Sequence, residues 1–369
     1  MRGLRETPKR ILCGILVALV VARACAATGD DVQRSVSRMQ PSVARQVRPA
    51  TIADVDTYLK WKWRSDMSDP ATGLSNAALK VGVKKVYEAH EDREPWAETS
   101  ARMFAYLADN MAVGFSKFDC FPAIACWNRW DRPLSGVLSA RCAKVDARYS
   151  PGLRAEIKAL HDSGRGRADW KDFDHSAPDW ERILKLGFTG LKARVDAYTD
   201  DTPFYRAEKA TAETILRFVR RMLATAEAHP DAGSRLMQKE IASLRRLVAG
   251  PPQTCFDVMQ FTMLYFILSE HVNRFQVRTL GNIDASWWPY YRADLAAGRT
   301  TEADFREEFS HFIWQFGSID NYWGHPMYLG GTDRDGATLY NPLSDIILDV
   351  IDQEALPTPK FQVKLAANT

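Results

Sequence analysis

The stretch "GNIDASWWPYYRAD", Gly281–Asp294, holds four large aromatic side chains within five positions. Such a cluster of aromatic side chains either packs in a core or stacks on a ligand. A helix pattern follows, because Thr301 and Asp304 have the spacing of a capping box. Phenylalanines then recur on one face of that helix, at Phe305, Phe309, Phe312 and Phe316. We expect the aromatic run to pack at the entrance to a helix; it comprises Trp287, Trp288, Tyr290 and Tyr291.

Other patterns outside this region are mainly helical. Residues 205–228 read as an amphipathic helix, and Thr254 with Asp257 caps a mostly buried helix that follows two prolines. At the end of the chain, "KFQVKLA" alternates polar and apolar residues, which predicts a strand with Phe361, Val363 and Leu365 on one face. A strand needs a neighbour, so either an earlier strand pairs with it or the chain is incomplete.

The composition describes a globular protein with a sizeable core, since 46% of the 369 residues are hydrophobic and 26% are charged. The formal net charge is +3, and the first 26 residues contribute five basic residues against one acid. The remainder therefore carries −1, which indicates no nucleic-acid-binding surface.

The N-terminus has the layout of a secretory signal. Four basic residues precede the apolar run Ile11–Ala22, and Ala24-Cys25-Ala26 follows as a small-residue cleavage site. We expect a signal-like segment at 1–26, a linker or arm at 27–56 and a domain at 57–369. The protein would be exported if this signal functions.

Cysteines and acids predict no metal centre. Four cysteines remain after the signal-like segment, Cys120, Cys126, Cys142 and Cys255, and their spacing matches no zinc motif, so we expect isolated buried thiols. Asp172, Asp174 and His175 would suit a metal-dependent hydrolase, yet Ser176-Ala177-Pro178-Asp179 reads better as a helix start. Likewise "GGTDRDGATLYN", 330–341, reads as a turn and not as a calcium loop. We assign no metal ligands.

A family resemblance emerges from several segments in order. "GNIDASWWPYYRADLAAGRTTEADF" resembles the glycyl radical enzymes, the pyruvate formate-lyase family, where Gly-Arg-x-Asp-Gln leads into Tyr-Pro-Tyr-Tyr and a Thr-Glu-capped helix. "KFDCFPAIACWNRWDRPL", "HSAPDWERILKLGFTGLKARV" and "GGTDRDGATLYNPLSDIILDVI" are similar to other family segments, so the likeness spans about 90–369. Asn282 and Ala285 stand where the family motif has Arg and Gln, so the local contacts of the motif should differ.

The resemblance implies a fold and a chemistry. The expected fold is a helix-rich α/β structure like the N-terminal half of a ten-stranded α/β barrel. The family uses a thiyl radical on a Cys loop and a glycyl radical that an activating enzyme installs with S-adenosylmethionine and an iron-sulfur cluster. Both loops should come after residue 369, so we assign no catalytic residue or directly bound cofactor and expect the chain to be inactive alone.

The resemblance also suggests substrate contacts. In relatives, the residues just upstream of the Gly-x-x-Asp motif face the substrate. The corresponding residues here are Gln276, Val277 and Arg278. Arg278 would hold a carboxylate through paired hydrogen bonds. Asp119 and His325 are further candidates from the similar segments. The expected enzyme is a dehydratase or lyase of anaerobic metabolism that acts on a small polar or carboxylate substrate.

Localisation and assembly follow from the same two observations. The family resemblance implies a cytoplasmic enzyme whose partner is the radical-activating enzyme, and it leaves a homodimer open. The signal-like segment instead favours a non-catalytic exported protein, or a remnant that reuses the half-domain for binding.

Overall fold

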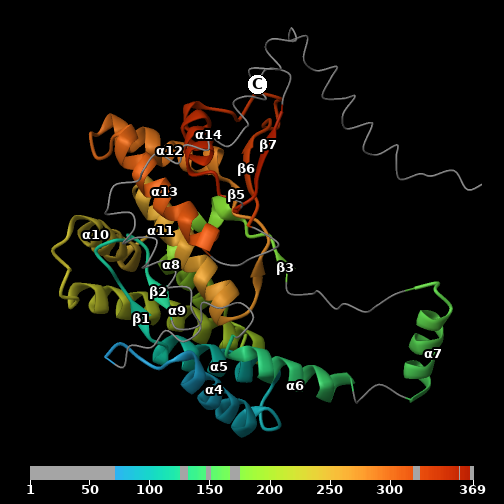
Figure 1. Ribbon diagram of the computed structural model, residues 1–369. Helices are drawn as coiled ribbons and strands as arrows, with labels where there is room; N and C mark the ends of the chain where they lie inside the picture. The colour runs from blue at the N-terminus through green and yellow to red at the C-terminus, as the bar shows by residue number, and fades with distance from the viewer. Residues whose placement is uncertain are drawn as a thin grey trace, which may run out of the picture. The chain divides into compact units, whose positions relative to one another are not determined.

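The computed structural model describes residues 71–124, 132–146, 151–166, 175–318, 325–356 and 358–365 (Figure 1). The signal-like segment, the linker at 27–56, Cys126, Asp172 and Asp174 lie outside the described residues. The described residues form a helix-rich α/β structure with a few short strands.

The N-terminal part consists of helices and one small antiparallel pair. Strand β1 pairs with β2, with Val113 opposite Ile124. The elements are α4 (Asn76–His90), α5 (Trp96–Asn110), β1 (Val113–Gly114), β2 (Ala123–Ile124), α6 (Leu134–Asp146) and α7 (Pro151–Asp162). Helices α4 and α5 pack together through buried residues such as Leu79 and Phe104, so this region adds to the main core.

A long central helix confirms the amphipathic pattern at 205–228. Helix α9 buries Phe218, Val219 and Met222 and packs against α5, α8 and α10. Its neighbours are α8 (Trp180–Asp196) and α10 (Arg235–Ala249), and α9 itself spans Pro203–Glu227. Asp179 caps α8 by accepting a hydrogen bond from Arg182 N at 3.2 Å, which confirms the helix start read from Ser176–Asp179.

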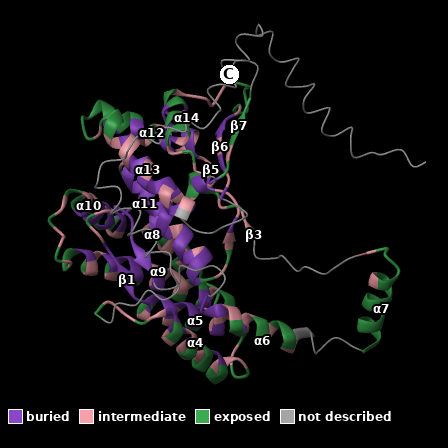
Figure 2. Cartoon of the chain, in the orientation of Figure 1, coloured by how far each residue is buried: buried purple, intermediate pink, exposed green. Residues whose placement is uncertain are grey.

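Two capping boxes open the buried helices as expected. Thr254 and Asp257 exchange hydrogen bonds at the start of α11, and Thr301 and Asp304 do so at the start of α13. The elements of this region are α11 (Cys255–Phe266), the π-helix η1 (Ile267–Val272), α12 (Ile283–Ala296), α13 (Glu302–Ser318) and α14 (Pro342–Glu354). Their buried faces form the continuous core in Figure 2.

The later strands are short and parallel. Strand β3 (His175–Ser176) pairs with β4 (Gln276–Val277), and β5 (Gly281–Asn282), β6 (Met327–Gly330) and β7 (Phe361–Lys364) form a second sheet in that order. The earlier strand β6 is thus the neighbour that the C-terminal strand requires. Val363 is 40% exposed and Leu365 is 80% exposed. The described residues therefore do not bury these two side chains of the expected apolar face.

The aromatic run lies inside a helix rather than before one. Helix α12 already begins at Ile283, and Trp287 and Tyr291 are buried on one of its faces. The Trp287 ring meets Phe312 at 5.3 Å, and the Tyr291 ring meets Phe305 at 4.9 Å, between ring centroids. The run therefore packs α12 onto α13, and the prediction of a packing role is confirmed by these contacts.

Asp284, the acid of the Gly-x-x-Asp segment, ties three elements together. It is fully buried and accepts hydrogen bonds from Gly330 N at 2.8 Å and Ser344 Oγ at 2.5 Å. Asn282, at the position of the family Arg, donates instead to Gly330 O at 3.0 Å. The motif thus joins α12 to β6 and α14.

Position 281 accommodates only a residue without a side chain. Its φ is +81°, and a Cβ there would lie 2.6 Å from Cδ1 of Trp180, whose Nε1 donates to Thr279 O at 2.9 Å. We expect Gly281→Ala to destabilise the protein more than Gly298→Ala. Gly298 has φ +64° and no atoms near its Cβ position, so it incurs only the left-handed strain, about 1–2 kcal/mol. Urea unfolding of both variants measures the difference, and equal losses would contradict the steric role.

Two of the three described cysteines fit the expectation of buried thiols. Cys120 and Cys255 are buried and free, whereas Cys142 on α6 is exposed, so the expectation is wrong for Cys142. The turn expected at 330–341 is present, since Asp333 Oδ1 accepts from Asp335 N and Ala337 N, each at 2.9 Å. Across the described residues, no helix combines the length and apolarity that crossing a membrane demands.

Candidate functional site

Strand β4 and the residue after it carry the three predicted substrate contacts. Val277 is fully buried, whereas Gln276 and Arg278 are half-buried. Side chains alternate along a strand, so Gln276 and Arg278 share the face opposite Val277. The strand is held by β3, because Arg278 N donates to Ser176 O at 2.8 Å and Ser176 Oγ donates to Gln276 O at 3.2 Å.

A buried carboxylate supports the other edge of β4. Glu270, on the π-helix η1, is 2% exposed, and its Oε2 accepts a hydrogen bond from Val277 N at 3.2 Å. His325 Nε2 lies 3.2 Å from the same oxygen. Arg132 donates from Nη1 to Glu270 O at 2.5 Å and from Nη2 to Glu270 Oε1 at 3.3 Å. Two distant segments, at Arg132 and His325, therefore converge on the carboxylate that holds the backbone of β4.

Glu270 is ionised within this network. Burial opposes ionisation, but the positive fields and hydrogen bonds of His325, His271 and Arg132 outweigh it and lower the pKa of Glu270 from 4.5 to about 2. Single-turn π-helices often occur at functional sites, where they redirect a side chain. Here η1 positions the Glu270 carboxylate at the edge of the predicted substrate strand.

Aromatic rings enclose the network. The imidazole of His325 lies 4.6 Å from the ring of Phe266 and 5.1 Å from that of Phe316, between centroids. His271 packs on the same Phe266 at 5.1 Å. His325 is 1% exposed and lies beside Glu270 in apolar surroundings. Such an environment strengthens charge interactions and excludes water.

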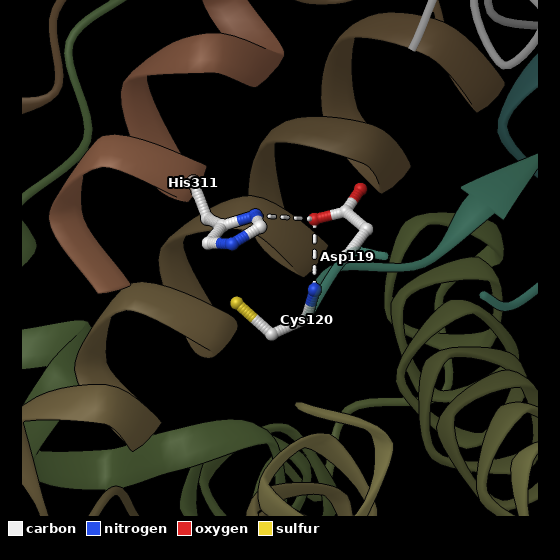
Figure 3. Close-up of side chains that lie close together, drawn as sticks. All are labelled: Asp119, Cys120 and His311. Carbon is white, nitrogen blue, oxygen red and sulfur yellow. Dashed lines mark hydrogen bonds and ion pairs between the residues drawn. The ribbon is translucent and has the colours of Figure 1, made fainter. Parts of the chain in front are cut away.

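Asp119 lies in a second buried cluster. Its Oδ1 accepts hydrogen bonds from Cys120 N at 2.8 Å and Phe121 N at 3.3 Å, and Gln315 Nε2 lies 3.2 Å from each carboxylate oxygen. His311 Nδ1 is 3.5 Å from Asp119 Oδ1 (Figure 3). Asp119, Cys120 and His311 each offer one metal-ligand atom, and these atoms lie within 4.8 Å of one another.

Sequence reasoning missed Glu270, Arg132 and His311. Arg132 precedes Glu270 by 138 positions, so no motif spacing links them. A signal was present in "LSEHV", where Glu270 and His271 interrupt an otherwise apolar helix. Buried ionisable residues need partners, and that requirement singles out these two positions.

Comparison with known proteins identifies the family. The "PFL-like: Pyruvate formate lyase-like" family matches residues 144–369, which is more than half of the chain. The chain belongs to this family of glycyl radical enzymes. The match includes β3–β7, Glu270 and the candidate substrate strand.

Two curated relatives are named as a dehydratase and a sulfite-lyase. The chain is 21% identical over 228 residues to (2S)-3-sulfopropanediol dehydratase of Klebsiella oxytoca, covering 53% of this chain and 27% of that protein. It is 26% identical over 149 residues to isethionate sulfite-lyase of Oleidesulfovibrio alaskensis, covering 34% of this chain and 17% of that protein.

Solved structures share the fold. A glycyl radical enzyme from Archaeoglobus fulgidus superposes with a TM-score of 0.61 at 17% identity, covering 84% of this chain and 48% of that chain. Hydroxyproline dehydratase from Clostridioides difficile gives 0.61 at 16% identity, covering 87% and 48%. The chain thus spans about half the length of these solved relatives, and the expected helix-rich α/β fold of the family is confirmed.

Proposed function

We propose that this chain forms the N-terminal half of a glycyl radical enzyme of the dehydratase or carbon–heteroatom lyase type. The observation that carries the proposal is the strand β4, which presents Gln276 and Arg278 on one face and rests on the buried Glu270–Arg132–His325 network. The names of the relatives favour a small polar substrate with an anionic group.

Each residue of this site has a proposed role. Arg278 holds the carboxylate or sulfonate of the substrate through its planar guanidinium, and Gln276 hydrogen-bonds a neighbouring hydroxyl. Val277 packs the strand into the core, and Glu270 with His325 fixes its position. Asp119 belongs to the second cluster and receives no substrate role in this proposal.

Turnover in this proposal needs parts outside the described residues. The glycyl radical, installed by an activating enzyme with S-adenosylmethionine and an iron-sulfur cluster, would supply hydrogen-atom abstraction through a cysteine loop. Burial raises the pKa of the thiols of Cys120 and Cys255 well above the usual range, so neither resembles an exposed reactive thiol. The residues described here would bind and orient the substrate and exclude water.

The binding role of Arg278 is tested on the full chain. We expect Arg278→Ala to weaken binding of isethionate and of small hydroxycarboxylates by about tenfold to 100-fold, because a hydrogen-bonded ion pair contributes ~1.5–3 kcal/mol. Arg278→Lys retains the charge but loses the paired geometry, so it should recover part of the affinity. Isothermal titration measures both variants.

Arg292, an exposed arginine on α12, serves as the matched control. Arg292→Ala should bind like the wild type. Absence of saturable anion binding by the wild type, or equal binding by Arg278→Ala, would contradict the proposed substrate role of Arg278.

The catalytic role is tested separately by the coding DNA beyond Thr369. We expect it to encode a Gly-x-x-Cys loop and an Arg-Val-x-Gly-Tyr-like loop. Intact flanking sequence that encodes neither would exclude radical catalysis by this gene product and would leave the binding role to stand on titration.

A further inference from the structure

The second buried cluster joins two segments that lie far apart in the chain. Asp119 and Cys120 come from the connection between β1 and β2, and His311 comes from α13. Figure 3 shows the His311 ring facing the Asp119 carboxylate, with the Cys120 sulfur beside them. Within the described part of the chain, these three residues form a group with the donor types and proximity of a metal site.

We propose that Asp119, Cys120 and His311 bind one Zn²⁺ ion. Thiolate, imidazole and carboxylate are the three donor types that zinc takes in proteins, and together they select a borderline-soft cation over Mg²⁺ or Ca²⁺. Binding forms the Zn–S bond as the Cys120 thiol releases its proton to solvent, and no oxidation is involved. The ion would fasten the β1–β2 connection to α13.

The spacing of the donors suits this ion after a small contraction. Zinc bonds of about 2.0–2.3 Å at tetrahedral angles place two ligand atoms roughly 3.5 Å apart. The three donor atoms already lie within 4.8 Å of one another. Side-chain shifts of about 1 Å complete three corners of the tetrahedron, and water takes the fourth.

The residues around the donors orient them. Gln315 Nε2 donates to His311 O at 2.8 Å and to both oxygens of Asp119 at 3.2 Å, so one amide positions two of the ligands. Partners of this kind are the usual support of metal ligands. His311 Nδ1 is buried and makes no hydrogen bond within the described residues; its charged neighbour is Asp119 Oδ1, 3.5 Å away.

The three donor residues are buried in the interior of the protein. Asp119 is 1% exposed, Cys120 is 0% exposed and His311 is 4% exposed. Charges interact more strongly in such surroundings than in water, so the Asp119 carboxylate favours a cation at this position.

Cobalt substitution of the full chain tests the proposal directly. We expect the metal-free wild type to bind one equivalent of Co²⁺ with an intense thiolate-to-cobalt charge-transfer band, which Zn²⁺ then abolishes by displacement. Cys120→Ser should lose the band, and Cys255→Ser should keep it. Cys255 is the matched control because it is also a buried free thiol, 2% exposed.

Two further variants keep the test decisive if Cys120→Ser does not fold. His311→Gln and Asp119→Asn should each lower the Co²⁺ affinity more than ~100-fold, beyond the 10–100-fold effect of losing a supporting residue. No charge-transfer band in the wild type would overturn the proposal without reference to any variant. A band that persists in Cys120→Ser, or equal affinity in His311→Gln, would overturn it as well.

Discussion

Replacing Trp287 by alanine is expected to lower the free energy of unfolding by about 3–5 kcal/mol. The indole is 1% exposed and packs edge-on against Phe309 and Phe312, with ring centroids 6.1 and 5.3 Å away. These contacts join α12 to α13, so the cavity left by alanine opens within the core where relaxation is limited. Urea denaturation followed by circular dichroism measures the loss.

Trp288 provides the control one position along the same helix. It is only half-buried, and its ring lies 6.2 Å from that of Tyr291 between centroids. Trp288→Ala removes a side chain of the same size from the periphery of the core, so its cost should be clearly smaller. Equal losses for the two variants would contradict the assignment of Trp287 as the core side chain of the run.

Replacing Glu270 by glutamine is expected to cost about 3–5 kcal/mol of stability at pH 7, because it removes the negative charge that Glu270 supplies to the buried guanidinium of Arg132. Arg132 is 7% exposed and Glu270 is 2% exposed, so water cannot replace the lost carboxylate. Glu181→Gln is the control, since its pair with Lys185 is exposed at 78% and 69% and should contribute less than about 1 kcal/mol.

The same carboxylate should give the protein an acid-sensitive stability. The pKa of Glu270 is about 2 in the folded protein against an ordinary value of 4.5, so folding favours the ionised form. Its contribution is complete above pH 4.5 and is lost as the pH falls from about 4.5 to about 2. At ~1.4 kcal/mol for each pKa unit, the loss amounts to about 3 kcal/mol.

The free energy of unfolding, measured across this acid range, distinguishes the wild type from Glu270→Gln. The wild type should lose about 3 kcal/mol more than Glu270→Gln, which has no carboxylate to protonate at this position. Parallel curves for the two proteins would show that Glu270 does not carry the acid sensitivity.

Local patterns predicted the helices and their starts well. Thr254 and Asp257, like Thr301 and Asp304, form capping boxes because the bonds involve residues only three positions apart. The stripe ending in Phe312 and Phe316 is buried for the same reason, since helical periodicity alone decides which side chains share a face. The aromatic run was expected at the entrance to a helix, whereas it lies inside α12, which begins at Ile283.

Contacts between distant segments could not be predicted in this way. Period-two alternation identified the strand at Phe361, yet Val363 is exposed because the described neighbours of β7 leave that part of its surface open. Cys142 likewise proved exposed, since burial depends on what packs against α6 and not on the residue type.

The sequence by itself determined the family, the capping boxes and apolar faces of the helices, and the packing role of the Trp-Trp-Pro-Tyr-Tyr run. Each of these depends on order and spacing along the chain. Only the tertiary structure brought Arg132 and His325 to Glu270, and His311 to Asp119 and Cys120. A buried charge is stable only beside its partners, and packing of the helices selects those partners from positions that no sequence spacing connects.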